Sequence, residues 1–205
     1  MKPRIAIIHY NVGNLQNLKN ALDYQNLPAE FVTRPEELSG FSHVILPGVG
    51  AFQTAMDHLR GQEMDQAVQE IVALGTPLLG VCVGMQVLFS ASQENGRHQG
   101  LGIVPGQMVR FPDKPGLKVP HMGWNTVAFT RQDPLLEGIP DHSHFYFVHS
   151  YRGVLETPDD GLGLTDYDGL FPSIVRRGNV WGVQFHPEKS QNPGLALLAN
   201  FSRIA

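Results

Sequence analysis

The chain has 205 residues, one cysteine and a formal net charge of −4, from 15 basic and 19 acidic side chains. A single cysteine excludes a disulfide scaffold, and the acidic excess without a Lys/Arg run argues against nucleic-acid binding. The apolar stretches fall far short of the ~18 residues of a membrane span, and the N-terminus does not resemble a signal peptide. These exclusions favour a cytoplasmic protein, and the length suits one domain over residues 1–205. With 22 Gly and 15 Pro in a chain that is 42% hydrophobic, many tight turns between buried elements are expected, which suits an α/β enzyme.

Short apolar runs alternate with helical periodicities over the first ninety residues or so. After the third run, Pro47-Gly48-Val49-Gly50 predicts a loop. Because parallel strands need helical crossovers, this alternation predicts a doubly wound sheet. Strands are expected at 4–8, 29–33, 43–46 and 78–81, and amphipathic helices at 15–25, 64–72 and 85–89.

From about residue 100 the chain changes to short extended pieces around Pro and Gly, which predicts antiparallel or mixed pairing. One last helix is expected over 195–201. The sequence shows no linker, repeat or low-complexity tract, so both halves are expected to share one core. The extended pieces are 108–111, 125–129, 145–148, 153–155, 173–177 and 180–184.

The most informative segment is Gly80-Val81-Cys82-Val83-Gly84, a G-x-C-x-G pattern between a predicted strand and a predicted helix. A nucleophile on so sharp a turn sits in strained backbone, and flanking glycines remove obstructing Cβ atoms. The helix N-terminus favours a thiolate, and an N–H just past the nucleophile can bind an oxyanion. A lone cysteine is otherwise often a buried apolar residue. The two flanking glycines favour the catalytic interpretation.

A thiol nucleophile needs a base, and His186 in Val183-Gln184-Phe185-His186-Pro187-Glu188 follows a predicted strand. Pro187 biases His186 toward an extended conformation, which would send residues 186 and 188 to the same side. Glu188 could then orient the imidazole, the third role of a catalytic triad. The other interpretation of this segment is a surface His-Pro-Glu turn.

Two further interpretations fit poorly. A zinc site of the H-x-E type needs further cysteines, and the pair His142 and His144 lacks an H-E-x-x-H motif or an acidic cluster. A dinucleotide site would need a third glycine where Gln53 stands. The Gly48-Val49-Gly50 segment therefore makes more sense as the second half of an oxyanion hole.

Together, several motifs resemble class I, triad-type glutamine amidotransferases, and the likeness runs through most of the chain. The segments at 118–125 (KVPHMGWN) and 186–190 (HPEKS) are most similar to the glutaminase subunits of imidazole glycerol phosphate synthases. The remaining matching segments are 47–52, 80–86 and 145–151. The resemblance implies a flavodoxin-like, doubly wound mixed α/β sheet with the class I glutamine amidotransferase fold.

The resemblance also implies roles for individual residues. Cys82 would be the nucleophile, His186 the base and Glu188 its orienting partner, with no cofactor or metal. The remaining positions form three groups. The oxyanion hole would use backbone N–H groups of Val49 or Gly50 and of Val83. The glutamine pocket would use Gly48, Gly50, Gln86, His149, Ser150 and Tyr151. The partner interface or ammonia exit would lie near Asn11, Asn14, Trp124, Tyr146 and Lys189.

In that family, ammonia from glutamine travels to a separate (β/α)₈ cyclase subunit, which makes imidazole glycerol phosphate and aminoimidazole carboxamide ribotide in histidine biosynthesis. The expected assembly is therefore a heterodimer whose free glutaminase is nearly silent. Two departures are mild: His9-Tyr10-Asn11 stands for Asp-Tyr-Gly, and Val83 follows Cys82 where leucine is more common. Two alternatives remain open, a stand-alone cysteine γ-glutamyl hydrolase and an idle module that activates a synthase by docking.

Overall fold

A mixed nine-stranded sheet runs through the computed structural model, which describes residues 3–10 and 15–204. Its order is β2-β1-β3-β4-β13-β12-β11-β8-β9. The first five strands pair in parallel and the last four continue the sheet in antiparallel pairing. Their bounds are β1 Ile5–Ile8, β2 Ala29–Val32, β3 His43–Gly48, β4 Leu78–Cys82, β8 His121–Phe129, β9 Ser143–His149, β11 Gly161–Asp166, β12 Leu170–Arg177 and β13 Val180–Val183.

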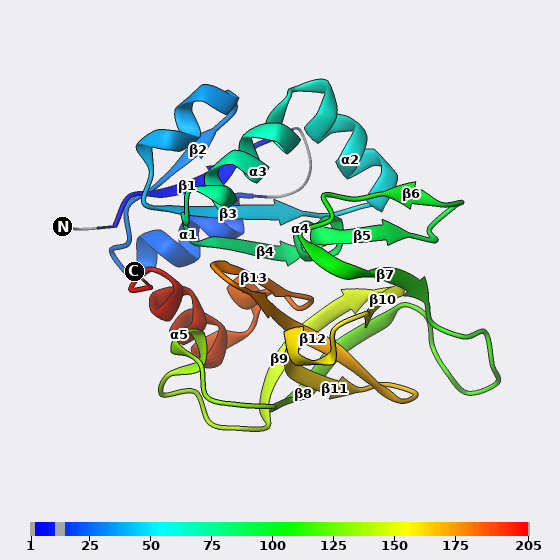
Figure 1. The fold of residues 1–205 in the computed structure, drawn as a ribbon. Coiled ribbons are helices and arrows are strands. Elements are labelled where there is room, and N and C mark those ends of the chain that lie inside the picture. The colour runs from blue at the N-terminus through cyan, green and yellow to red at the C-terminus, as the bar shows by residue number, and fades with distance from the viewer. Residues whose placement is uncertain (1–2, 11–14, 205) are drawn as a thin grey trace.

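A second sheet of four strands, in the order β10-β7-β5-β6, lies beyond the carboxyl ends of β3 and β4 (Figure 1). Strand β5 pairs in parallel with β7, and the other two pairings are antiparallel. This sheet therefore stands next to the edge where open α/β sheets place their sites. The bounds are β5 Phe89–Ser92, β6 His98–Gln99, β7 Val104–Arg110 and β10 Tyr151–Leu155.

The helices pack in two groups around the parallel strands. Helix α1 contacts α5, whereas α2 contacts α3 and α4, and the short α4 lies against β3, β4 and β13. The bounds are α1 Gln16–Tyr24, α2 Phe52–Gly61, α3 Met64–Ala73, α4 Val83–Leu88 and α5 Gln191–Phe201, with short 3-10 helices η1 Pro35–Gly40, η2 Pro134–Leu136, η3 Pro158–Asp160 and η4 Pro187–Lys189.

The loop predicted at Pro47-Gly48-Val49-Gly50 is shorter than expected, because β3 extends to Gly48 and α2, which was not predicted, begins at Phe52. The signal for α2 was present in the sequence. Its buried residues Phe52, Ala55, Met56 and Leu59 follow the i, i+3, i+4, i+7 spacing of an amphipathic helix. Strands β5, β6 and β11 were likewise not predicted.

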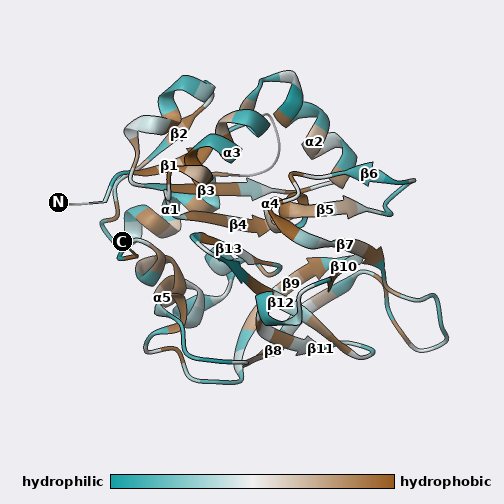
Figure 2. Ribbon diagram, in the orientation of Figure 1, coloured by the Kyte–Doolittle hydropathy of each residue, from teal (hydrophilic) through white to brown (hydrophobic). Residues whose placement is uncertain are grey.

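The core is built from continuous apolar strands. All residues of β1, β3, β4 and β13 are buried, as expected for parallel strands covered on both faces. Figure 2 shows β4 hydrophobic along its length, whereas the hairpin strand β6 is hydrophilic. Among the described residues, no helix has the length and apolar character needed to cross a bilayer.

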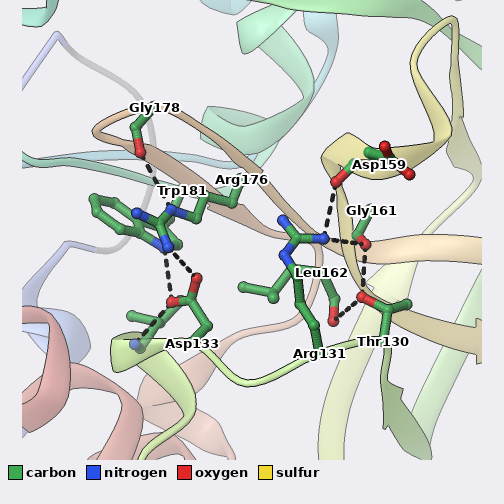
Figure 3. A network of polar contacts seen from close by, with 10 residues as sticks. Thr130, Arg131, Asp133, Asp159, Gly161, Leu162, Arg176, Gly178 and Trp181 are labelled. Atoms are coloured by element: carbon green, nitrogen blue, oxygen red, sulfur yellow. Dashed lines mark hydrogen bonds and ion pairs between the residues drawn. The ribbon is translucent and has the colours of Figure 1, made fainter.

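A buried carboxylate ties the segment before η2 to β12 and β13. Asp133, whose side chain is 0% exposed, accepts hydrogen bonds from Trp181 Nε1 at 3.1 Å and from Arg176 Nη1 at 2.6 Å (Figure 3). It also caps η2 through the N–H of Leu135. The Arg176 guanidinium in turn lies 4.8 Å from the Trp181 ring centroid. Both oxygens of this carboxylate thus accept hydrogen bonds, which hold η2 against β12 and β13.

Replacing Asp133 by alanine is therefore expected to lower the free energy of unfolding by about 3 kcal/mol, because it leaves buried donors unpaired. Urea denaturation measures the effect. The comparison variant is Arg131→Ala, which removes hydrogen bonds from an exposed guanidinium to the carbonyls of Asp159 and Gly161. Its cost should stay near 1 kcal/mol. Equal costs for the two variants would contradict this role of Asp133.

Candidate active site

The predicted nucleophile stands on a strained turn between β4 and α4. Cys82 has φ 55° and ψ −114°, a backbone conformation that side-chain-bearing residues rarely adopt. It ends β4 and directly precedes the first residue of α4, so the predicted strand-turn-helix is confirmed. Strain of this kind persists only where the surroundings enforce it, and it gathers at functional sites.

The two flanking glycines are required by close backbone contacts. A Cβ on Gly84 would lie 1.8 Å from the carbonyl oxygen of Leu46 in β3. One on Gly80 would lie 2.8 Å from the Gly84 carbonyl oxygen. Only glycine at both positions lets α4 turn back this tightly against β3 and β4. The two glycines therefore allow the sharp turn on which Cys82 sits.

His186 reaches the same edge because β13 pairs in parallel with β4, with Val183 opposite Val81. Its Nδ1 lies 2.8 Å from Glu188 Oε1, and the two side chains are only 6% and 7% exposed. The extended conformation expected around Pro187 is confined to His186, since the next three residues form η4. Glu188 therefore meets the ring from a 3-10 turn rather than from an extended chain.

The electrostatics favour a protonated His186. Burial lowers its pKa, but hydrogen bonds with Cys82 and Glu188, together with their charges, raise it to about 10. Because Glu188 takes Nδ1–H, the other ring nitrogen is left for Cys82. At neutral pH this arrangement favours an imidazolium beside the sulfur atom. An imidazolium so placed can stabilise a thiolate and then donate a proton.

A cavity of about 330 Å³ opens over Cys82 and His186. Most of the residues expected in the oxyanion hole and the glutamine pocket line it. Gly48 does not line it, because this residue is packed against the start of α4. A Cβ on Gly48 would lie 2.7 Å from the backbone nitrogen of Gly84. The lining residues are Val49, Gly50, Cys82, Val83, Gln86, Glu94, Pro120, Val148, His149, Ser150, Tyr151 and His186.

Glu94 is the pocket residue of most chemical interest that the sequence analysis missed. It lies between β5 and β6, and its Oε2 accepts a 2.7 Å hydrogen bond from the backbone N–H of Phe52 at the start of α2. The contact joins residues 42 positions apart, so no local pattern announces it. The pocket thus contains a carboxylate that the N–H of Phe52 holds in place.

The residues expected at the partner interface are brought together only in part. Trp124 and Tyr146 are paired across β8 and β9, with ring centroids 6.0 Å apart. Lys189 Nζ lies 5.8 Å from the Tyr146 ring centroid, and Trp124 is 47% exposed. We call these three residues the aromatic–lysine face. Asn11 and Asn14, also expected there, lie outside the described residues.

Comparison with known protein families decides the affiliation, because the family described as "Glutamine amidotransferase class-I" matches residues 7–204. The chain belongs to this family. Among named relatives of this amidotransferase, "Imidazole glycerol phosphate synthase subunit HisH" of Desulfitobacterium hafniense is 49% identical over 97% of this chain and 93% of the relative. The subunit of the same name from Moorella thermoacetica is 47% identical over 100% of this chain and 96% of the relative.

Solved structures support the fold of the amidotransferase. "Structure of PurLQS from Thermotoga maritima" aligns with a TM-score of 0.76 at 17% identity, covering 98% of both chains. A second structure, described as a glutamine amidotransferase, gives a TM-score of 0.74 at 22% identity over 96% of this chain and 98% of the other. At such low identities the likeness shows the class I glutamine amidotransferase fold alone.

Proposed function

We propose that this amidotransferase hydrolyses glutamine to glutamate and ammonia at Cys82 and supplies the ammonia to a synthase that makes imidazole glycerol phosphate. The observation that carries the proposal is the Cys82, His186 and Glu188 arrangement inside a chain 43–49% identical, over nearly its full length, to subunits named for that synthase. The accompanying product would be the aminoimidazole carboxamide ribotide of histidine biosynthesis.

In the first step, the Cys82 thiolate attacks the side-chain amide carbon of glutamine. The carbon–sulfur bond forms, and the carbonyl oxygen becomes an oxyanion facing the backbone N–H of Val83 and that of Val49 or Gly50. His186 then donates its proton to the leaving nitrogen, so the carbon–nitrogen bond breaks and ammonia departs. The product left on the enzyme is a γ-glutamyl thioester.

In the second step, water hydrolyses the thioester. His186 is now neutral and takes a proton from the attacking water, while the carbon–sulfur bond breaks and the thiolate returns. Glu188 keeps Nδ1 of the ring occupied throughout, so the other ring nitrogen stays available for both transfers. Within the described part of the chain, the second Glu188 oxygen, Oε2, has no hydrogen-bond partner, so no neighbouring donor draws on the carboxylate charge.

Substrate orientation would come from the far end of the pocket. The Glu94 carboxylate, anchored on the N–H of Phe52, matches the α-ammonium group of glutamine. The Gln86 amide is held by a 3.1 Å hydrogen bond to the fully buried Gln184 and would contact the substrate from α4. The turn at residues 149–151 would close the pocket on its remaining side.

The partner would be a (β/α)₈ cyclase subunit in a heterodimer, docked over the aromatic–lysine face. Trp124 and Met122 support this placement, because both are large apolar side chains left 47% and 63% exposed on β8. An interface of this kind typically buries such aromatic anchors. Residues 118–125, which carry the resemblance to glutaminase subunits, supply both of them.

The deciding experiment measures glutamate release from glutamine by the purified chain, first alone and then mixed with the cyclase subunit and its nucleotide substrate or product. Near silence alone and strong turnover in the mixture is the expected result. Equal turnover in both samples would instead identify an independent γ-glutamyl hydrolase. Silence in both would contradict the proposal and favour an idle docking module.

A further inference from the structure

Two buried histidines beside the pocket form a hydrogen-bonded chain, and the triad chemistry uses neither of them. His121 and His149 are opposite each other in the β8–β9 register, and His121 Nδ1 lies 2.9 Å from His149 Nε2. At one end, His149 Nδ1 lies 2.7 Å from the carbonyl oxygen of Tyr151. At the other end, Asn125 Nδ2 lies 3.2 Å from His121 Nε2. We call this the Asn125–His121–His149 relay.

The partners fix which nitrogen carries each proton. The Tyr151 carbonyl can only accept, so His149 Nδ1 is the donor and Nε2 of the neutral ring is an acceptor. His121 must then donate from Nδ1, which makes its own Nε2 an acceptor. The Asn125 amide meets this need: its Nδ2 also donates to the Asp166 carbonyl and its Oδ1 accepts the N–H of Thr126.

The surroundings keep both rings neutral. His121 and His149 are 3% and 6% exposed, and His121 is stacked between Phe147 and Tyr167 with centroids 4.8 and 4.0 Å away. Burial lowers the pKa of His121 to about 4 and that of His149 to about 3. A neutral His149 also matters for the triad, because a charge there would repel the His186 imidazolium.

We propose that His121 and Asn125 are positioning residues for the glutamine pocket, acting through His149 to hold the 149–151 turn. That turn joins the last residue of β9 to the first residue of β10, so it links the two sheets. Its three residues line the cavity over Cys82. The relay thereby connects β8, on which Trp124 is exposed, to the wall of the pocket. The inference rests on the proposed function only for the identity of the ligand.

The chemical core of the inference can be tested without activity. Nitrogen-15 NMR of the histidine side chains in the full chain is expected to show both His121 and His149 as neutral Nδ1–H tautomers from pH 6 to pH 8. In Asn125→Asp, a carboxylate replaces the amide and accepts from Nε2–H, so His121 should become an imidazolium at neutral pH. Nε2–H tautomers in the unsubstituted chain, or an unchanged His121 in Asn125→Asp, would overturn the relay.

The effect on the pocket is measured by labelling Cys82 with a diazoketone analogue of glutamine, and by glutaminase kinetics in the complex with the cyclase. His121→Leu should raise the half-saturating analogue concentration and KM for glutamine about tenfold, the effect of one lost buried hydrogen bond, with little change in kcat. His121→Asn keeps a donor near the Nδ1 position and should restore most of that loss. The same replacement at exposed His142, whose φ of 59° asparagine tolerates, is the matched control.

Iodoacetamide distinguishes a change in the glutamine pocket from a change in the reactivity of Cys82, because it alkylates the thiolate without occupying that pocket. Equal iodoacetamide rates in unsubstituted chain and His121→Leu, with a tenfold difference only for the diazoketone, would support the relay. Equal loss with both reagents, or no rescue by His121→Asn, would overturn it. If the unsubstituted complex releases no glutamate, the proposed function fails, while the tautomers still decide whether the relay exists.

Discussion

Cys82→Ala is expected to lower glutamate release in the complex by at least about 10⁴-fold, because a thioester cannot form without the sulfur atom. Cys82→Ser should be nearly as inactive. A hydroxyl is a much weaker acid than a thiol, so the serine stays protonated beside the His186 imidazolium and no anionic nucleophile forms. The measurement is single-turnover glutamate release at saturating glutamine. KM for any residual activity should stay near its original value, since the pocket lining is otherwise unchanged.

The control for this pair of variants is folding. Alanine and serine face the same backbone strain as cysteine at φ 55°, so the thermal unfolding midpoints should stay close to that of the unsubstituted chain. A Cys82→Ala variant that keeps more than about one per cent of the activity, with unchanged stability, would remove Cys82 from the chemistry. The buried-cysteine interpretation of the G-x-C-x-G segment would then be the better one.

Local sequence patterns are sufficient to predict the turn that carries Cys82. The glycines of the 80–84 segment, placed between an apolar strand and a helix, are local features, and the turn that they predict is confirmed. The approach of His186 follows from a second local pattern plus one rule, that parallel strands end at the same edge of a sheet. Two short patterns were therefore enough to bring the expected nucleophile and base together.

The rest of the pocket depends on contacts that no local pattern encodes. Glu94 enters because the β5–β6 connection meets the first turn of α2. His121 reaches His149 only through the register of β8 against β9. Strand β11, with glycines at 161 and 163, carries a weak strand signal, yet it forms because β8 and β12 pair on its two sides. At Gly163 a Cβ would lie 2.7 Å from the Val127 side chain, so the packing requires glycine there. The same glycine weakens the strand pattern in the sequence.

Glu188→Gln is expected to lower kcat by about 10² to 10⁴-fold, because the ring loses the carboxylate that holds its orientation and stabilises its charge. The pH dependence should move as well. The hydrogen bond and charge of Glu188 raise the pKa of His186, so their removal lowers that pKa. The imidazolium that protonates the leaving nitrogen is then lost at a lower pH, and the basic limb of the kcat profile shifts to lower pH.

Glu94→Gln is the matched comparison for Glu188→Gln, since it replaces a pocket carboxylate by the same amide without contacting His186. It should raise KM for glutamine by weakening the contact to the α-ammonium group, and it should leave the basic limb in place. Profiles of kcat against pH for the three enzymes measure the difference. If both variants shift the basic limb equally, that limb does not report on His186. If Glu188→Gln changes KM alone, Glu188 binds substrate rather than orienting the base, and the mechanism proposed above is wrong.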